Sequence, residues 1–179
     1  FATADFALSE KLTVTAGLRY SDEEKDVSVA SVLPAVQLAA GNPVGNSCRV
    51  TDGNCFFDFS EATNPGQTKF ETDNVSPKLG FNYEINEQMR AYGGWTRAFR
   101  AGGFNFRNTA VDTTNFGPGP FQDEEVDSIE IGLKTEPTEN SKLNIAVFQT
   151  DISDMQREIN QADPVAGVVQ IIRNTADAT

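Results

Sequence analysis

Two cysteines are the first residues of this chain whose type and spacing could support chemistry. Cys48 and Cys55 lie close together in a polar, turn-rich stretch. In an acidic chain that looks exported, such a pair is typical of a local disulfide, which would stabilise its loop by roughly 2–3 kcal/mol. Free thiols are the alternative. A metal site is disfavoured, because two thiolates lack the further Cys or His ligands of a zinc tetrahedron.

Two arginines, Arg97 and Arg100, stand just before a Gly-Gly pair at 102–103. A guanidinium group can bind a carboxylate or phosphate through two parallel hydrogen bonds, so these residues could contact an anionic ligand or another domain inside a lumen. The alternative, which we favour, is structural. In that case the arginines pair with acids of neighbouring strands, such as Glu130, and the glycines relieve crowding where a strand becomes a loop.

Aromatic residues cluster in the two long polar stretches of the chain. Exposed aromatic rings could hold a small-molecule ligand such as a sugar by stacking, but loops that pack on one another would use the same residues, so both interpretations stay open. The ligand-contacting candidates in these stretches are Phe56, Phe57, Phe59, Phe104, Asn105 and Phe106.

Composition excludes several classes of protein. The chain has no histidine, which removes His-based bases, Ser-His-Asp triads and His-rich zinc sites, and we predict no catalytic residue and no cofactor. Its formal net charge of −12 disfavours nucleic acid as a partner. The acidic run of Asp123, Glu124, Glu125 and Asp127 lacks the spacing of a calcium loop, so a solvated acidic face is the default interpretation.

The elements that must position these residues are β-strands. Apolar and polar residues alternate in several segments, and no run approaches the roughly 18 apolar residues of a transmembrane helix. We expect about seven strands. Their approximate ranges are 1–8, 12–29, 74–83, 89–104, 126–136, 143–157 and 168 onward. Pro77 lies inside one of them and cannot donate a ladder hydrogen bond, so a local bulge is expected there.

The connections alternate between short and long. Short turns are predicted at 9–11, 85–88 and 137–140, and long loops at 30–69 and 105–120. The apolar part of each strand lies beside the short turn, and the charged part leads to the long loop. This order is typical of an outer-membrane barrel, with tight periplasmic turns and extended extracellular loops. A secreted β-sandwich is the alternative, but it does not explain the short–long order.

Five motifs resemble the barrel region of TonB-dependent receptors, in the same order. They cover nearly all of the chain except the two long loops. The motifs are LTVTAGLRY (12–20), VSPKLGFNY (75–83), WTRAFRAGGFN (95–105), VDSIEIGLK (126–134) and AVFQTDISDMQ (146–156). The resemblance implies an all-β, antiparallel barrel segment of a 22-stranded transporter in the bacterial outer membrane. On this expectation the chain is a partial barrel domain, without its plug domain and its C-terminal strands.

The resemblance also implies function and partners. Such receptors take up scarce ligands with energy relayed by an inner-membrane complex, so the expected partners are outer-membrane lipid, the plug of the same protein, the TonB complex and a small ligand such as a ferric siderophore. Saccharides and cobalamin remain open as cargo. A passive porin or an adhesin barrel is the second hypothesis, and an outer-membrane enzyme is disfavoured because this segment has no histidine.

Overall fold

The computed structural model describes residues 1–31, 57–106, 118–163 and 167–179. Regular structure in these ranges consists of strands, and none of their residues belongs to a helix that could cross a membrane. The strands are β1 (Ala2–Ala7), β2 (Leu12–Asp26), β3 (Val29–Ser31), β4 (Phe57–Phe59), β5 (Lys69–Asn86), β6 (Met89–Arg100), β7 (Glu124–Thr138), β8 (Ser141–Ser153), β9 (Gln156–Asp163) and β10 (Gly167–Asn174).

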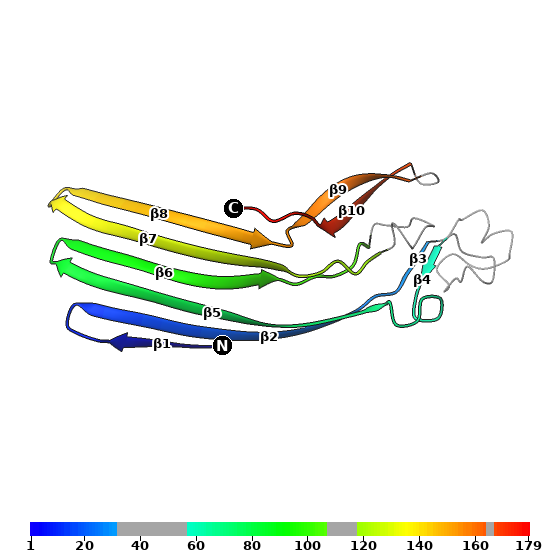
Figure 1. Ribbon diagram of the computed structural model, residues 1–179, viewed down its shortest axis with the longest axis horizontal. Helices are drawn as coiled ribbons and strands as arrows, with labels where there is room; N and C mark the ends of the chain where they lie inside the picture. The colour runs from blue at the N-terminus through cyan, green and yellow to red at the C-terminus, as the bar shows by residue number, and fades with distance from the viewer. Residues whose placement is uncertain (32–56, 107–117, 164–166) are drawn as a thin grey trace.

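Six of these strands form one antiparallel sheet in the order β1-β2-β5-β6-β7-β8. They lie side by side along the long axis, with the short turns at one end and the longer connections at the other (Figure 1). Polar side chains close the short turns. The Ser9 hydroxyl accepts hydrogen bonds from the amides of Lys11 and Leu12, and the Asn86 side chain accepts one from the amide of Gln88.

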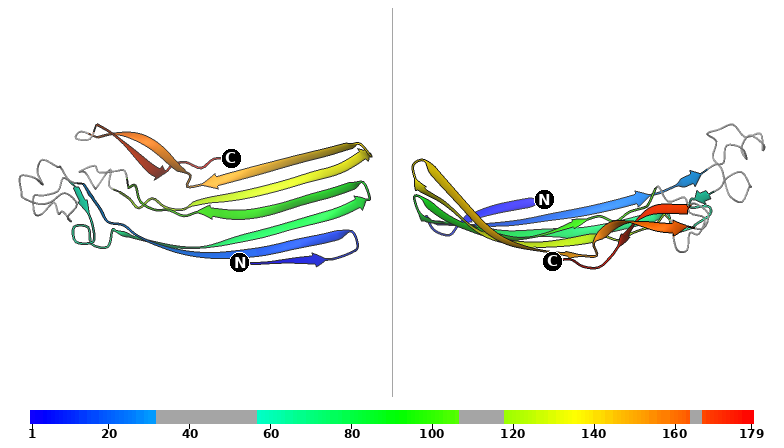
Figure 2. Two further views of the ribbon diagram at one scale, coloured as in Figure 1. Left: turned by 180° about the vertical axis from the view of Figure 1, so that it is seen from behind. Right: turned by 90° about the horizontal axis from the view of Figure 1, so that it is seen from above.

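The sheet is a single curved layer (Figure 2), and its two faces carry different side chains. Directly paired residues of neighbouring strands point to the same side, so the register sorts side chains into rows. One row contains Phe6, Val14, Phe81, Gly93, Ile131 and Val147, and we call its side the apolar face. The adjacent row contains Asp5, Thr15, Gly80, Gly94, Glu130 and Phe148, and its side is the polar face.

The apolar face is uncovered. Ile131 is 59% exposed and Val147 is 68% exposed, and the sheet packs on no second layer within the described residues. A β-sandwich would bury this face against a partner sheet. The sandwich expected as the alternative from the alternating pattern is therefore absent from the described part of the chain.

Phe148 lies on the polar face, because Leu143, Ile145 and Val147 set the apolar parity of β8 and Phe148 has the opposite parity. One prediction about a single residue in the sheet was wrong. Pro77 lies in no bulge. The β2–β5 pairing passes it without a shift, and the β5–β6 ladder begins only at Lys78, so no neighbour in β6 requires the amide hydrogen that proline lacks.

Two strands that were expected to continue into the loops end near the edge of the sheet. β2 ends at Asp26, before the predicted strand end at 29. β3 then begins at Val29 and pairs with β4, which lies in the loop predicted at 30–69. Asp154, whose φ is 52°, ends the long strand expected over 143–157, and β9 begins two residues later. β10 was expected as the seventh wall strand, but it pairs with β9. The chain returns to the sheet edge at Ala178, which bridges to Ile152.

A small apolar core lies where the strands leave the sheet. Val27, Phe59, Phe70 and Phe104 are buried together, and Val29 packs against them. Four separate segments each supply one of the buried residues, so this core fixes the β3–β4 hairpin and the residues after β6 onto the end of β5. The amide of Val27 donates to the carbonyl of Thr68, which closes the same unit.

Replacing Phe59 by alanine should loosen this unit without unfolding the sheet. Phe59 is 1% exposed, and truncating a buried phenylalanine costs about 3–5 kcal/mol. Hydrogen exchange of the β3 and β4 amides in the full-length protein should therefore become faster, while exchange within β5–β8 stays unchanged. Phe106→Ala is the matched control, since Phe106 is 67% exposed. Equal effects of both changes would contradict the assigned core.

Candidate functional site

The two candidate arginines point to opposite faces of the sheet. Arg97 pairs with Asp127, two positions beyond the pair of Trp95 and Ile129 on the same strands. Because every second residue of a strand points to the same side, Arg97 lies on the apolar face. Arg100 pairs with Glu124 and lies on the polar face. The three-residue spacing of the arginines on a strand requires this separation. They therefore do not form one site on a single face of the sheet.

Arg97 is held by acids of the neighbouring strand. Its Nη2 lies 2.6 Å from Oδ2 of Asp127, and its Nε lies 3.1 Å from Oδ1 of the same carboxylate, so the contact is bidentate. The indole nitrogen of Trp95 also donates to Oδ1 of Asp127, at 2.9 Å, and Glu125 approaches Nε at 3.4 Å. We expected a wall acid such as Glu130 as the partner. The partner differs because Glu130 lies on the other face.

The polar face carries an ordered aromatic residue in this region. The ring of Tyr92 lies over Gly132 of the neighbouring strand, where it leaves no room for a side chain. The ammonium group of Lys134 lies 4.9 Å from the centre of the ring, a cation–π contact. A depression of about 380 Å³ adjoins this ring, with Gly80 and Gly94 at its floor and Lys78 and Glu130 at its rim.

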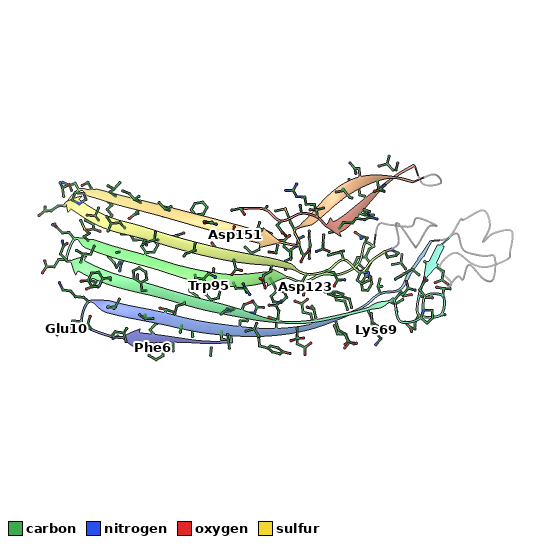
Figure 3. All side chains as sticks on the ribbon, in the orientation of Figure 1. Phe6, Glu10, Lys69, Trp95, Asp123 and Asp151 are labelled. Atoms are coloured by element: carbon green, nitrogen blue, oxygen red, sulfur yellow. The ribbon has the colours of Figure 1, made fainter. Side chains whose placement is uncertain are left out.

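The segment that contains the Gly-Gly pair forms the centre of a polar junction beyond the sheet. The amide of Gly102 donates to Oδ1 of Asp123 at 2.6 Å, and its carbonyl accepts from Lys25 Nζ at 2.5 Å. The hydroxyl of Thr72 donates to the other oxygen of Asp123. A Cβ at Gly102 would collide with the carbonyl of Phe121, so only glycine fits. Figure 3 shows Asp123 in this region, beyond the level of Trp95.

Three amide side chains attach the β9–β10 hairpin to this junction. Asn105 is buried; its Nδ2 donates to the carbonyl of Ile172 at 3.1 Å, and its Oδ1 accepts from the amide of Ile172 at 2.6 Å. Gln156 donates to the carbonyls of Arg100, Ala101 and Gln122, and Asn174 binds both the amide and the carbonyl of Gln122. These side chains replace the ladder hydrogen bonds that the hairpin does not make with the sheet.

Two charged side chains close the turns near the start of β5. Glu61 accepts from the hydroxyl of Thr68 at 2.6 Å and from the amide of Gly66 at 2.9 Å, and these hydrogen bonds lower the pKa of Glu61. Asp26 and Glu24 raise the pKa of Lys69, whose ammonium lies 3.6 and 3.5 Å from their carboxylates. The Lys69 ion pairs are exposed and add little stability, whereas Glu61 binds the buried Thr68 and so orders the loop end.

The aromatic candidates have different surroundings. Phe59 and Phe104 are buried, with their ring centres 6.4 Å apart, so in this structure they pack loop segments together. Phe106 is largely exposed. Phe57 is placed only by its backbone in β4, and Phe56, Cys48 and Cys55 lie outside the described residues.

The acidic run does not converge on one point. Asp123 binds Gly102, Glu124 accepts from the amide of Gln156 at 2.6 Å, and Glu125 and Asp127 face Arg97. Within the described ranges, no three acidic or cysteine side chains gather in a way that could hold a metal ion. The junction residues Lys25, Thr72, Gln156 and Asn174 were not predicted, because single polar residues in polar stretches form no pattern.

The chain matches the model of a known family along its whole length. The family model described as "TonB dependent receptor-like, beta-barrel" matches residues 1–179. The chain belongs to the TonB-dependent receptors. This family consists of transporters and receptors, and its members are outer-membrane barrel proteins of Gram-negative bacteria. The predicted fold, an antiparallel barrel segment, is confirmed, and the barrel is not closed by this chain.

Solved structures of TonB-dependent receptors share the arrangement of strands. The ferric yersiniabactin uptake receptor FyuA from Yersinia pestis matches 98% of this chain with a TM-score of 0.61 and a sequence identity of 21%. The copper transporter OprC also matches 98% of this chain, with a TM-score of 0.66 and an identity of 12%. The hemophore receptor HasR of Serratia marcescens, solved with its hemophore HasA and heme, matches 93% of this chain with a TM-score of 0.53 and an identity of 16%. The chain spans 21%, 23% and 27% of these three structures, and the likeness establishes the fold alone.

Replacing Asn105 by aspartate should release β10 from the junction. The carboxylate cannot donate to the carbonyl of Ile172, so this carbonyl loses its hydrogen bond and the attachment of β10 weakens by about 1–3 kcal/mol. The amide of Ile172 should then exchange its hydrogen faster in the full-length receptor. Asn160→Asp is the matched control, because Asn160 is exposed in β9. If Asn105→Asp leaves exchange at Ile172 unchanged, Asn105 does not fasten the hairpin.

Proposed function

We propose that this chain is part of the wall of an outer-membrane active transporter that imports a scarce ligand with energy delivered through TonB. The observation that carries the proposal is the single-layered sheet. Along its strands, successive side chains point alternately to the uncovered apolar face and to the polar face. A barrel wall between lipid and a wet lumen requires this alternation.

The height of the apolar band supports a membrane wall. On β2 the apolar row extends from Leu12 to Tyr20, about nine residues, and a tilted strand needs about 9–11 residues to cross the hydrocarbon layer. Beyond this band the same face becomes acidic, with Asp22 opposite Asp73 and Glu24 opposite Glu71. Such residues belong above the hydrocarbon.

The orientation follows from the connections. We place the short turns on the periplasmic side and the loops at 30–69 and 105–120 outside the cell. Among the ligand- or plug-contacting candidates, Arg100 lies on the polar face and Phe106 is exposed at the loop end. Phe56 and Phe57 stay candidates in the first long loop. Arg97 is not among them, because it faces away from the lumen. The proposed partners are outer-membrane lipid, a plug domain of the same protein, the TonB complex and a small-molecule ligand.

An iron–siderophore complex is the first choice of cargo. Two similar structures, the ferric yersiniabactin receptor FyuA and the ferric-catecholate import receptor Fiu of E. coli, are named for ferric ligands, and their identity to this chain is 21% and 16%. Copper and heme appear in the names of others. Saccharides and cobalamin are the alternatives within the family, and a passive porin or adhesin barrel is the alternative outside it.

Uptake by the full-length receptor should depend on TonB. In iron-limited cells that lack their own receptors, its expression should restore accumulation of a labelled ferric siderophore from a panel. Deletion of TonB or a protonophore should abolish that accumulation. Uptake that persists without TonB would favour a passive porin, and failure with every ferric complex, together with uptake of another cargo, would refute only the iron assignment.

Two consecutive residues of β8 test which face meets lipid. Val147 and Phe148 are 68% and 70% exposed in the sheet but point to the apolar and polar faces, respectively. An arginine facing the bilayer midplane costs about 2–4 kcal/mol. Val147→Arg should therefore reduce the amount of folded, heat-modifiable receptor in the outer membrane, whereas Phe148→Arg should not. The reverse order would invert the assignment of the faces.

A further inference from the structure

Charged side chains are sorted between the two faces of the sheet. The formal net charge of −12 means that acidic residues outnumber basic ones along the whole chain. The register nevertheless turns most basic residues of the sheet toward the polar face, and most acidic residues at the loop end toward the side of the apolar face. The basic set includes Arg19, Lys25, Lys78, Arg90, Arg100 and Lys134, and the acidic set includes Asp22, Glu24, Glu71, Asp73, Glu125 and Asp127. The polar face is thus the less acidic side of an acidic chain.

Two of these basic residues, Arg19 on β2 and Lys78 on β5, are diagonal neighbours, and we call them the cationic pair. Arg19 is directly opposite Ser76, and Lys78 is directly opposite Gly17. Diagonal neighbours on antiparallel strands lie about 7–8 Å apart, which is within reach of long side chains. Both residues are exposed. Because each stands beside a small residue, the two cationic groups can reach into the same space over the polar face.

The donor groups of the cationic pair are available. Nε of Arg19 donates to the hydroxyl of Ser21 at 3.1 Å, and its two terminal nitrogens bind no other residue that the structure describes. Nζ of Lys78 makes no hydrogen bond or ion pair within the same residues. Glu23, which lies on the same face of β2 toward the loop end, is 3.3 Å from Lys25. In the described part of the chain, no ion pair therefore neutralises the cationic pair.

Hydroxyl groups lie next to the cationic pair. Ser76 stands beside Arg19 on β5, and Thr96 stands opposite Lys78 on β6. Lys78 and Thr96 also line the depression of about 380 Å³ on the polar face, whose floor is made of glycine. Charged donors, hydroxyl groups and room for several atoms suit a compact anion with more than one oxygen. A packed protein segment would instead require apolar side chains at the centre of its contact.

We propose that the cationic pair binds an anionic group of the imported ligand on the lumen side of the wall. Carboxylate, catecholate or phosphate oxygens accept hydrogen bonds from Arg19 and Lys78, so the site selects an anionic complex over a neutral one. A positive patch between walls of low dielectric constant also raises the local concentration of anions. This inference rests on the proposed function, which places the polar face inside the barrel. It goes further, because it names the charge of the cargo and the residues that recognise it.

Equilibrium binding to the purified full-length receptor tests the proposal. The probes are an anionic ferric tris-catecholate and a neutral ferric tris-hydroxamate, each measured at low and at high salt. The wild-type receptor should bind the anionic complex more tightly, and rising salt should weaken that binding. Arg19→Gln and Lys78→Gln should each lower the affinity for the anionic complex roughly tenfold, the loss expected when a hydrogen bond to a charged group is removed. Lys78→Arg should retain most of the affinity.

Lys69→Gln is the matched control. Lys69 lies at the loop end of β5 (Figure 3), the strand that also carries Lys78, and its replacement changes the net charge by the same amount. Its side chain points to the opposite side of the sheet, where it pairs with Glu24 and Asp26. The affinity of this variant for both complexes should equal that of the wild type.

Four outcomes would overturn the proposal. They are binding of neither complex, tighter binding of the neutral complex, an equal loss of affinity in Lys69→Gln, and unchanged affinity in Arg19→Gln and Lys78→Gln. If the last two variants keep their affinity but make cells sensitive to a large antibiotic, the cationic pair holds the plug domain instead. Uptake assays with and without TonB separate this failure from failure of the proposed function. TonB-dependent uptake of a neutral cargo refutes only the anion site, whereas uptake that persists without TonB refutes the proposed function.

Discussion

Register between neighbouring strands is the constraint on which the rest of the structure depends. β2 and β5 pair without interruption from Leu12 opposite Tyr83 to Asp26 opposite Lys69. A slip of one residue would turn every side chain of a strand to the other face. Because the sheet has a single layer, a slipped strand would place polar side chains on the apolar face and apolar side chains on the polar face. The register must therefore be correct across all six strands.

Beyond the sheet, hydrogen bonds from side chains to the backbone replace the ladder hydrogen bonds between strands. Segments that leave the ladder still carry amides and carbonyls that need partners, and several of them are buried. Here Asn105, Gln156, Asn174 and Asp123 bind backbone groups of distant segments, and the aromatic core around Phe59 excludes water from one side. Gly102 belongs to this arrangement, because a Cβ there would collide with the carbonyl of Phe121.

The assignment of faces changes the interpretation of several residues. Arg97 and Arg100 resemble a paired anion site in the sequence, but they lie on opposite sides of the wall. Arg97 then belongs with Trp95 and Asp127 on the apolar face, and its guanidinium group is directed away from the polar face. Arg100 remains on the side where a transported ligand or a plug would lie. One strand thus carries residues for two different environments only three positions apart.

The sequence by itself determined the repeating features. Alternation over 12–20, 75–83 and 126–134 is a local property, and so are the polar turns, so the strands, their order and the family could be predicted. The ends of strands could not. Whether β2 stops at Asp26, or β10 pairs with β9 and not with the sheet, depends on contacts between segments far apart in the chain. The partners of Arg97 and the role of Asn105 also required the tertiary structure, because a single polar residue reveals its function only through the backbone or carboxylate that folding brings beside it.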